Sequence, residues 1–288
     1  MFAFVQAHKI NTVLIGSLLS FCITQSIGAV ELKVEVENLS STDGLYLTPV
    51  WVGFHNGAFD LYDYGSVASA GLERIAEDGD PSVLRSEFMA AAPTGSDGVI
   101  FGPAGFGGAP IIDPGEVTSA IFNVDGSANK YFSYASMVIP SNDAFIGNEN
   151  EFGIELFNAA GDFTGPVDIL VLGLNVNDVG TEVNNEIDAA FLNQATPDTG
   201  VSEGGFVQRH AGFYDSFSGP AGTPLILGGT NGAGIFFDPT ASDFTRDGFQ
   251  LARISISQVP EPSSVALFAL GLLGLRGIKK IRRSGVRT

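Results

Sequence analysis

Residues 137–147 read MVIPSNDAFIG: an apolar run is broken by a proline, two small polar residues and an acid, and apolar residues then resume. Proline cannot donate a hydrogen bond to a sheet, and with Ser and Asn beside it the segment is typical of a turn. The stretch therefore predicts two strands joined by a turn. Asp143 is either a local turn residue, accepting a backbone N–H two residues further on, or a ligand at a strand end.

Short β-rich runs separated by turn residues continue on both sides of this stretch. Residues 32–37 and 252–257 alternate apolar and polar side chains with a period of two, which is typical of a strand with one buried face. The other runs are bounded by Gly, Pro, Asn or Asp. This spacing predicts an all-β fold, an antiparallel β-sandwich, with strands over residues 32–37, 45–54, 119–124, 131–139, 153–157, 168–176 and 252–257.

One or two short helices are expected beside these strands. Ser66 is suited to cap a helix that carries Leu72 and Ile75 on one face and ends at Asp78-Gly79-Asp80-Pro81. A weaker helical pattern covers residues 186–192.

The N-terminus is typical of an export signal. Lys9 ends a weakly basic segment, and the apolar residues 12–22 are followed by small residues suited to cleavage near Ala29. The apolar run is too short to span a membrane. We therefore expect residues 1–29 to be a signal peptide.

The C-terminus combines a proline-rich motif, a short apolar run and a basic cluster. Pro260-Glu261-Pro262 precedes the apolar residues 265–275 and a group of Lys and Arg side chains. This order resembles the PEP-CTERM sorting tail of Gram-negative bacteria, which the membrane enzyme exosortase recognises and cuts. The resemblance implies that residues 259–288 are a sorting signal with a short transmembrane helix and a basic tail. The protein would then contact the membrane only through this tail, before processing places it at the cell surface or in an extracellular matrix.

The segment between these two ends is strongly acidic. Residues 30–258 contain seven Lys and Arg residues against 31 Asp and Glu residues, a difference of −24. Such a charge repels nucleic acid and anionic membrane surfaces, and it attracts divalent cations. No repeat of fixed period and no linker interrupts this segment, so we expect it to form one domain.

Few residues in this domain are suited to catalysis. Cys22, the only cysteine, leaves with the signal peptide, which excludes a cysteine nucleophile and a thiolate ligand. His55 and His210 are the two histidines that remain, too few for a His-rich zinc site. His210 lies near Asp215 and several serines, but a Gly-x-Ser-x-Gly motif is missing, so a structural role is favoured over a catalytic triad.

A second acidic turn follows the strand predicted over residues 168–176. Asp178 and Glu182 are four residues apart, with Gly180 between them. Glycine permits a tight bend that would bring both carboxylates to one point. Calcium takes about six to eight oxygen ligands, largely from loops, so the turn is compatible with a calcium site.

Two other functions are open on the residues alone. The first is a carbohydrate-binding module, in which Trp51, Tyr62 and Tyr64 would stack on sugar rings. The second is an extracellular hydrolase that uses clustered carboxylates. Such a pair would have to face each other across a cleft of roughly 5 to 9.5 Å.

The two acidic turns together resemble one protein family. Residues 139–147 resemble the Pro-Ser-x-Asp-aromatic-Phe-hydrophobic-Gly motif of the spondin domain, and residues 178–182 resemble its Asp-Ala-Gly-Thr-Asp motif. The resemblance covers most of residues 32–213. It implies a C2-like β-sandwich of secreted matrix and adhesion proteins. It also implies one calcium ion, held by Asp143, Asp178 and Glu182.

Two departures from the family pattern concern the candidate site itself. Ala144 stands where the family often has Trp, and Glu182 replaces an Asp, which keeps the charge and lengthens the side chain. The expected function is an exported, non-enzymatic, calcium-binding adhesion or matrix module of the bacterial envelope or exopolysaccharide layer. Its expected partners are exosortase and either exopolysaccharide or surface proteins.

Overall fold

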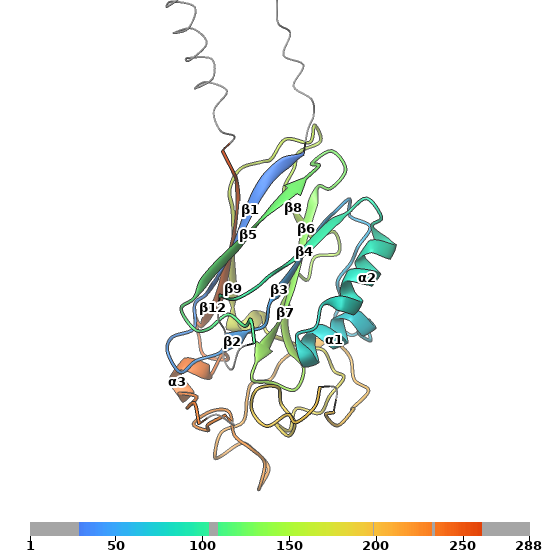
Figure 1. The fold of residues 1–288 in the computed structure, drawn as a ribbon. Coiled ribbons are helices and arrows are strands. Elements are labelled where there is room, and N and C mark those ends of the chain that lie inside the picture. Colours follow the sequence, from blue (N-terminus) through green and yellow to red (C-terminus); the bar gives the residue numbers. More distant parts are fainter. Residues whose placement is uncertain (1–28, 104–108, 198, 232–233, 261–288) are drawn as a thin grey trace, which may run out of the picture.

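The computed structural model describes residues 29–103, 109–197, 199–231 and 234–260. Two antiparallel sheets pack face to face, and two helices cover the outer face of one of them (Figure 1). This arrangement confirms the predicted all-β sandwich with short helices. Among the described residues, no helix has both the length and the apolar character needed to cross a membrane.

The first sheet contains the two ends of the described chain, because β1 and β12 are its central strands. All of its strand pairs are antiparallel. In order across the sheet, the strands are β5 (Val117–Val124), β1 (Val30–Asn38), β12 (Gln250–Gln258) and β9 (Val167–Leu172).

The second sheet is built around the β6–β7 hairpin, the two strands predicted from residues 137–147. Across the sheet, the order is β11 (Gln208–Arg209), β10 (Asn177–Asp178), β7 (Ala144–Gly147), β6 (Tyr131–Ile139), β3 (Val50–His55) and β4 (Ser96–Ile100). The short strands β2 (Tyr46–Leu47) and β8 (Ile154–Glu155) also pair with β6.

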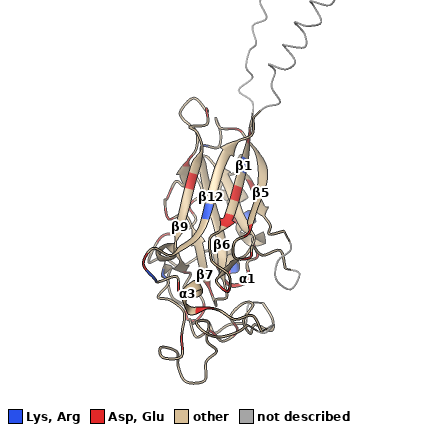
Figure 2. Cartoon of the chain, turned by 90° about the vertical axis from the view of Figure 1, so that its left-hand side faces the viewer, with Lys and Arg blue, Asp and Glu red and all other residues tan. Residues whose placement is uncertain are grey.

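The first sheet has one buried and one solvent-facing side. Along β1, buried and half-buried residues alternate, as the period-two pattern of its sequence predicts. The outer side carries mainly charged and small polar side chains, with acidic ones on β1 and β9 and a basic one on β12 (Figure 2). Arg253 and Glu37 form an ion pair of 2.7 Å across neighbouring strands of this face.

The second sheet is buried on both sides, which explains its continuous apolar runs. Every residue of β3 is buried, and so is nearly every residue of β6. The inner face contributes to the core of the sandwich, whereas the outer face packs under helices α1 (Ala70–Asp78) and α2 (Ser82–Ala91). Trp51, Phe59 and Phe88 form a cluster of ring contacts in this helix-covered layer.

Helix α1 begins three residues later than predicted. Ser69, rather than Ser66, is its N-cap, because the Ser69 hydroxyl accepts a hydrogen bond from the Leu72 N–H. Gly79, in the left-handed region at φ +66°, ends the helix. The sequence analysis missed α2, whose Glu87 carboxylate accepts a bond from the Gly71 N–H at the start of α1.

Several of the predicted segments differ in the structure. The strand expected over residues 45–54 is divided into β2 and β3. The strand expected over residues 168–176 ends at Leu172 and is followed by a 3-10 helix, Gly173–Asn175, and only residues 154–155 of the strand expected over residues 153–157 form β8. The helix predicted over residues 186–192 does not form, because Glu186, Asp188 and Phe191 all have positive φ angles, which no α-helix tolerates. The segment is instead a loop packed against the sandwich. A short helix, α3 (Pro239–Ser242), precedes β12.

The two ends of the described chain meet at one end of the sandwich, and the loops that follow β6 and β10 lie at the other (Figure 1). The Val259 N–H donates to the carbonyl of Glu31 at 2.9 Å, which holds the start of the C-terminal segment against β1. The predicted signal peptide and the predicted C-terminal transmembrane helix lie outside the described residues.

Glu186 is a buried carboxylate that holds distant loops together. Its two carboxylate oxygens accept bonds from the Tyr214 N–H and from the Ile226 N–H, the latter at 2.9 Å. Burial raises the pKa of this carboxyl group from 4.5 to about 7, against the opposing effect of the two N–H donors.

We predict that Glu186→Gln costs more stability at pH 5 than at pH 7.5. Between pH 4.5 and 7 the folded protein keeps a proton that the unfolded chain releases, so wild-type stability falls as the pH rises through that window. The glutamine variant lacks this titration, and the difference between the two should shrink by an amount on the order of 2 kcal/mol.

The measurement is urea unfolding at several pH values. Glu31→Gln, which changes an exposed acid, is the control and should show no such trend. A Glu186→Gln cost that stays constant from pH 5 to 7.5 would contradict the shifted pKa.

Candidate metal centre

The turn between β6 and β7 is held by its own side chains. The Ser141 hydroxyl donates to the Val138 carbonyl at 2.6 Å and accepts from the Ala144 N–H at 3.1 Å. The peptide bond between Ile139 and Pro140 is cis. The two Ser141 hydrogen bonds hold the turn between the strands.

The Asn142 side chain binds the loop that follows β10. Its side-chain oxygen accepts from the Glu186 N–H at 3.0 Å, and its amide donates to the Ile187 carbonyl at 2.8 Å. In addition, the Ala190 N–H donates to the Ser141 carbonyl at 2.9 Å. The turn is therefore an anchor for a segment more than 40 residues further along the chain.

Asp143 makes a similar long-range connection through its carboxylate. One oxygen, Oδ2, accepts from the backbone N–H groups of Thr181 at 3.0 Å and Glu182 at 3.1 Å. The interpretation of Asp143 as a local turn residue is therefore wrong, because its donors are 38 and 39 residues away. The other oxygen, Oδ1, is buried and has no hydrogen-bond partner within the described chain.

The electrostatic environment of Asp143 is unfavourable for its charge. The side chain is fully buried, and β7 and β10 are paired so that Ala144 lies opposite Asp178. Burial, followed by the negative charge of Asp178, raises the pKa of Asp143 to about 8, and its two N–H donors only partly offset this shift. In the absence of a cation, the negative charge of Asp178 therefore opposes the ionisation of Asp143.

Asp178 takes the local turn role that the sequence suggested for Asp143. Its Oδ1 accepts from the Gly180 N–H, two residues on, at 2.6 Å. Its Oδ2 accepts from the side-chain amides of Asn184 at 2.6 Å and Gln208 at 3.3 Å. Both oxygens are therefore oriented by donors. Oδ1 retains a lone pair for a further ligand, whereas Oδ2 already accepts two hydrogen bonds.

Glu182 is only partly brought into this group. Its backbone N–H binds Asp143, but its side-chain Oε1 accepts from the Gly200 N–H at 2.7 Å. In the described part of the chain, no three His, Cys, Asp or Glu side chains converge closely enough to hold a metal ion. The structure thus unites Asp143 and Asp178 and directs the Glu182 side chain toward Gly200.

Glu203 is an acid of this region that the sequence analysis missed. Its charge contributes to the raised pKa of Asp143, and its own pKa is raised by burial and by Asp178. A Cβ added at Gly205 would lie 2.8 Å from Glu203 Oε1 and 3.0 Å from the Gly180 carbonyl, so the carboxylate lies over this loop. Glu203 comes close to Gly180 only because residues far apart in the sequence pack together, which a local sequence pattern does not reveal.

His210 is a buried, neutral side chain beside the acids. Its Nδ1 accepts from the Gly212 N–H at 3.0 Å, so the ring proton is on Nε2. Burial lowers its pKa to about 4, against the opposing effect of Asp178. Asp215 instead accepts hydrogen bonds from its neighbours Phe217 and Ser218, which does not fit a triad with His210.

The two other functional interpretations find little support in this geometry. Trp51 is fully buried and Tyr62 nearly so, whereas Tyr64 is 42% exposed, so these rings do not form the flat stacking face of a sugar-binding module. Asp143 and Asp178 are almost completely buried, which leaves them without the access to substrate and water that a hydrolase needs.

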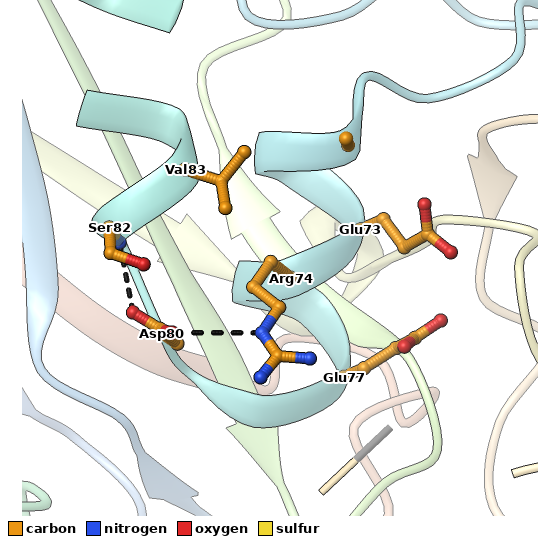
Figure 3. A pocket seen from close by; sticks show the side chains of 7 residues that line it. Glu73, Arg74, Glu77, Asp80, Ser82 and Val83 are labelled. Carbon is orange, nitrogen blue, oxygen red and sulfur yellow. Dashed lines mark hydrogen bonds and ion pairs between the residues drawn. The ribbon is translucent and has the colours of Figure 1, made fainter. Parts of the chain in front are cut away.

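A separate hollow of about 480 Å³ lies on the helical layer, lined by Ala70, Glu73, Arg74, Glu77, Asp80, Ser82 and Val83 (Figure 3). Its guanidinium is already paired: Arg74 contacts Asp78 at 3.1 Å and Asp80 at 3.6 Å. The first pair lies within α1, and the second connects α1 to Asp80, whose carboxylate also accepts from the Ser82 N–H at the start of α2. We therefore assign them a structural role.

We predict that Gly180→Ala destabilises the domain more than Gly204→Ala does. Both glycines have positive φ angles, +75° and +65°, so alanine costs about 1–2 kcal/mol of backbone strain at each. At Gly180 the new Cβ would also lie 2.5 Å from the Phe206 backbone nitrogen, whereas at Gly204 it would meet no atom within 4 Å.

Thermal unfolding of the two variants tests this close approach. The clash should lower the Tm of Gly180→Ala by several degrees more than that of Gly204→Ala. Equal losses would show that the loop is not packed as the structure has it.

Comparison with known proteins is consistent with these features. Residues 43–199, more than half of the chain, match the family model described as Spondin_N, and residues 258–283 match the PEP-CTERM protein-sorting motif. No curated protein matches the chain. The second match confirms the predicted sorting signal at Pro260-Glu261-Pro262 and indicates export with processing by exosortase. The chain therefore belongs to the Spondin_N family and carries a PEP-CTERM sorting motif.

Proposed function

We propose that this domain is a non-enzymatic calcium-binding adhesion module of the bacterial envelope or exopolysaccharide layer, with Asp143 and Asp178 as the central ligands. The observation that carries the proposal is the Asp143 carboxylate. It is fully buried, its Oδ1 lacks a partner among the described residues, and Asp178 raises its pKa. A buried anion without compensation is costly, and a bound cation would offset that cost.

The chemistry of the donors favours calcium over a transition metal. The candidate ligands are carboxylate oxygens, with backbone carbonyls nearby, and hard oxygen donors suit Ca²⁺. A nitrogen ligand from His210 is not available, because the bond from the Gly212 N–H keeps its proton on Nε2. The domain between the two sequence ends contains no cysteine.

Two residues, Glu182 and Glu203, are candidates for the third carboxylate ligand of the calcium ion. Family resemblance assigns it to Glu182, whose Oε1 is bonded to the Gly200 N–H. The charge distribution points to Glu203, since its carboxylate raises the pKa of Asp143. We propose Glu182 as the ligand, with Glu203 contributing charge to the outside of the site.

The residues of the site hold the loop in place whether or not a cation is bound. Asp143 binds the Thr181 and Glu182 N–H groups, and Asp178 binds the Gly180 N–H. A cation would neutralise the two acids and fix the β6–β7 turn to this loop. Its binding energy would then add to the stability of the folded state.

The position of the site supports a role in contacting partners. The loops around it lie at the end of the sandwich opposite to Val259, where the chain continues into the sorting motif (Figure 1). A module held through its C-terminal segment would therefore present the calcium loops outward, toward exopolysaccharide or other surface proteins.

We predict that Asp143→Asn removes the effect of calcium on stability. Asparagine keeps one oxygen for the Thr181 and Glu182 N–H groups and replaces the unpartnered Oδ1 with an uncharged amide. At 100 times its Kd, calcium should stabilise the wild type by about 2.7 kcal/mol. For a domain of this size that corresponds to a Tm rise of about 5–10 °C.

The Tm is measured for wild type and variant in calcium and in chelator. The variant should match or exceed the wild type in chelator and show no rise in calcium. Asp247→Asn, which removes one charge at an exposed position, is the control and should behave like the wild type. A calcium-dependent rise that survives Asp143→Asn would reject Asp143 as a ligand.

A further inference from the structure

A second cavity lies at the open edge of the sandwich, and none of the candidate metal ligands Asp143, Asp178 and Glu182 lines it. It has a volume of about 230 Å³ and lies between β9, the edge strand of the first sheet, and the β6, β7 and β11 strands of the second. Its polar lining consists of Tyr134, Asn148, Glu149, Asn150, Asn175 and Arg209.

The Tyr134 hydroxyl is the most informative group in this cavity. The residue is only 5% exposed, and among the described residues its hydroxyl has no hydrogen-bond partner. Its backbone N–H, by contrast, donates to the Asn148 side chain at 3.0 Å. The hydroxyl is not among the fully buried polar atoms of the described chain, so it is open to the cavity and available to a group that enters it.

Side-chain amides around the cavity add further hydrogen-bonding capacity. Asn175 uses its oxygen to accept from the Leu172 N–H, and Asn150 uses its oxygen to accept from the Phe152 N–H. In both cases the side-chain NH₂ has no partner within the described chain. The only bond from the Asn148 amide is a long one, 3.4 Å, to the Asn150 carbonyl.

The charges at the rim of the cavity neutralise each other. Arg209 donates to Glu149 Oε2 at 2.6 Å and to the Asn177 side chain at 3.0 Å, and its guanidinium lies 4.9 Å from the centre of the Tyr64 ring. The cavity therefore offers donors and acceptors without an unpaired charge. This arrangement suits a neutral polar ligand better than an anion or a cation.

The remaining wall of the cavity is apolar. Ile154 of β8 and Ile169 and Val171 of β9 contribute it. A sugar ring has hydroxyls around its edge and C–H groups on its faces, so it matches a lining that combines polar and apolar groups. The volume is below the range of about 300–1,000 Å³ that is typical for drug-sized ligands, which limits the ligand to about one ring.

We propose that this cavity binds a single neutral hexose unit, with the Tyr134 hydroxyl as the central hydrogen-bonding group. None of the rings of Trp51, Tyr62 and Tyr64 lines the cavity, although Arg209 at its rim contacts Tyr64. The site therefore recognises hydroxyls rather than stacking on aromatic rings. It is also independent of calcium, because none of the candidate metal ligands lines it.

Saturation-transfer NMR on the purified protein tests the proposal with D-glucose, D-galactose and D-mannose, and with dextran and galactomannan as polymers. We expect at least one neutral monosaccharide to bind, and the polymers distinguish a free sugar from a unit within a chain. Sodium glucuronate should bind at least tenfold more weakly. Preferred binding of glucuronate, or no transfer to any neutral probe, would overturn the proposal.

Tyr134→Phe provides the sharpest variant, because it removes only the unpartnered hydroxyl. It should weaken hexose binding at least tenfold while leaving the Tm unchanged within error. Tyr131→Phe, the same substitution on the same strand outside the cavity lining, should bind like the wild type. Equal affinity of Tyr134→Phe and wild type would assign any observed binding to another surface. All measurements are repeated in chelator, so that loss of calcium binding and loss of sugar binding are distinguishable.

Discussion

The Asp143 carboxylate is the interaction on which the functional end of the molecule depends. It connects the β6–β7 hairpin to the loop that follows β10 through two backbone N–H donors. Ser141 and Asn142 add bonds from the same turn to the same loop. Because the carboxylate is buried beside Asp178, these bonds are made at an electrostatic cost. A structural anchor and a candidate cation ligand are therefore the same side chain.

Because the second sheet is buried on both faces, the β6–β7 turn and the loop bound to it are held in a fixed position. The helical layer covers one face, and the first sheet covers the other. Strands β6 and β7 can therefore hold polar groups at their junction in a fixed position. The same sheet leaves an open edge near β9, where Tyr134 presents its hydroxyl to a cavity. The proposed metal site thus lies at the β6–β7 turn of the second sheet, and the proposed sugar site lies at the edge of the same sheet.

Local sequence patterns predicted the sandwich and most of its strands well, because period-two alternation and turn residues act over a few residues. They failed where contacts between distant residues decide the outcome. Residues 186–192 looked helical, but hydrogen bonds hold Glu186 in a loop with positive φ angles: its N–H donates to Asn142, and its carboxylate accepts from Tyr214 and Ile226.

The candidate site shows the same division. The sequence indicated Asp143 and Asp178, and the pairing of β7 with β10 brings them together. Asp143 nevertheless makes long-range bonds in place of the local turn bond. Glu203 could not be predicted, because only the packing of its loop over Gly180 places it near the two acids.

Calorimetric titration of Ca²⁺ into the wild-type protein and into Asp143→Asn is the direct test of Asp143 as a calcium ligand. We expect one site in the wild type and no measurable heat of binding in the variant. We also expect proton release on calcium binding near pH 7, because burial and Asp178 raise the pKa of Asp143 in the free protein to about 8. No binding to the wild type, or equal binding to both proteins, would contradict this assignment.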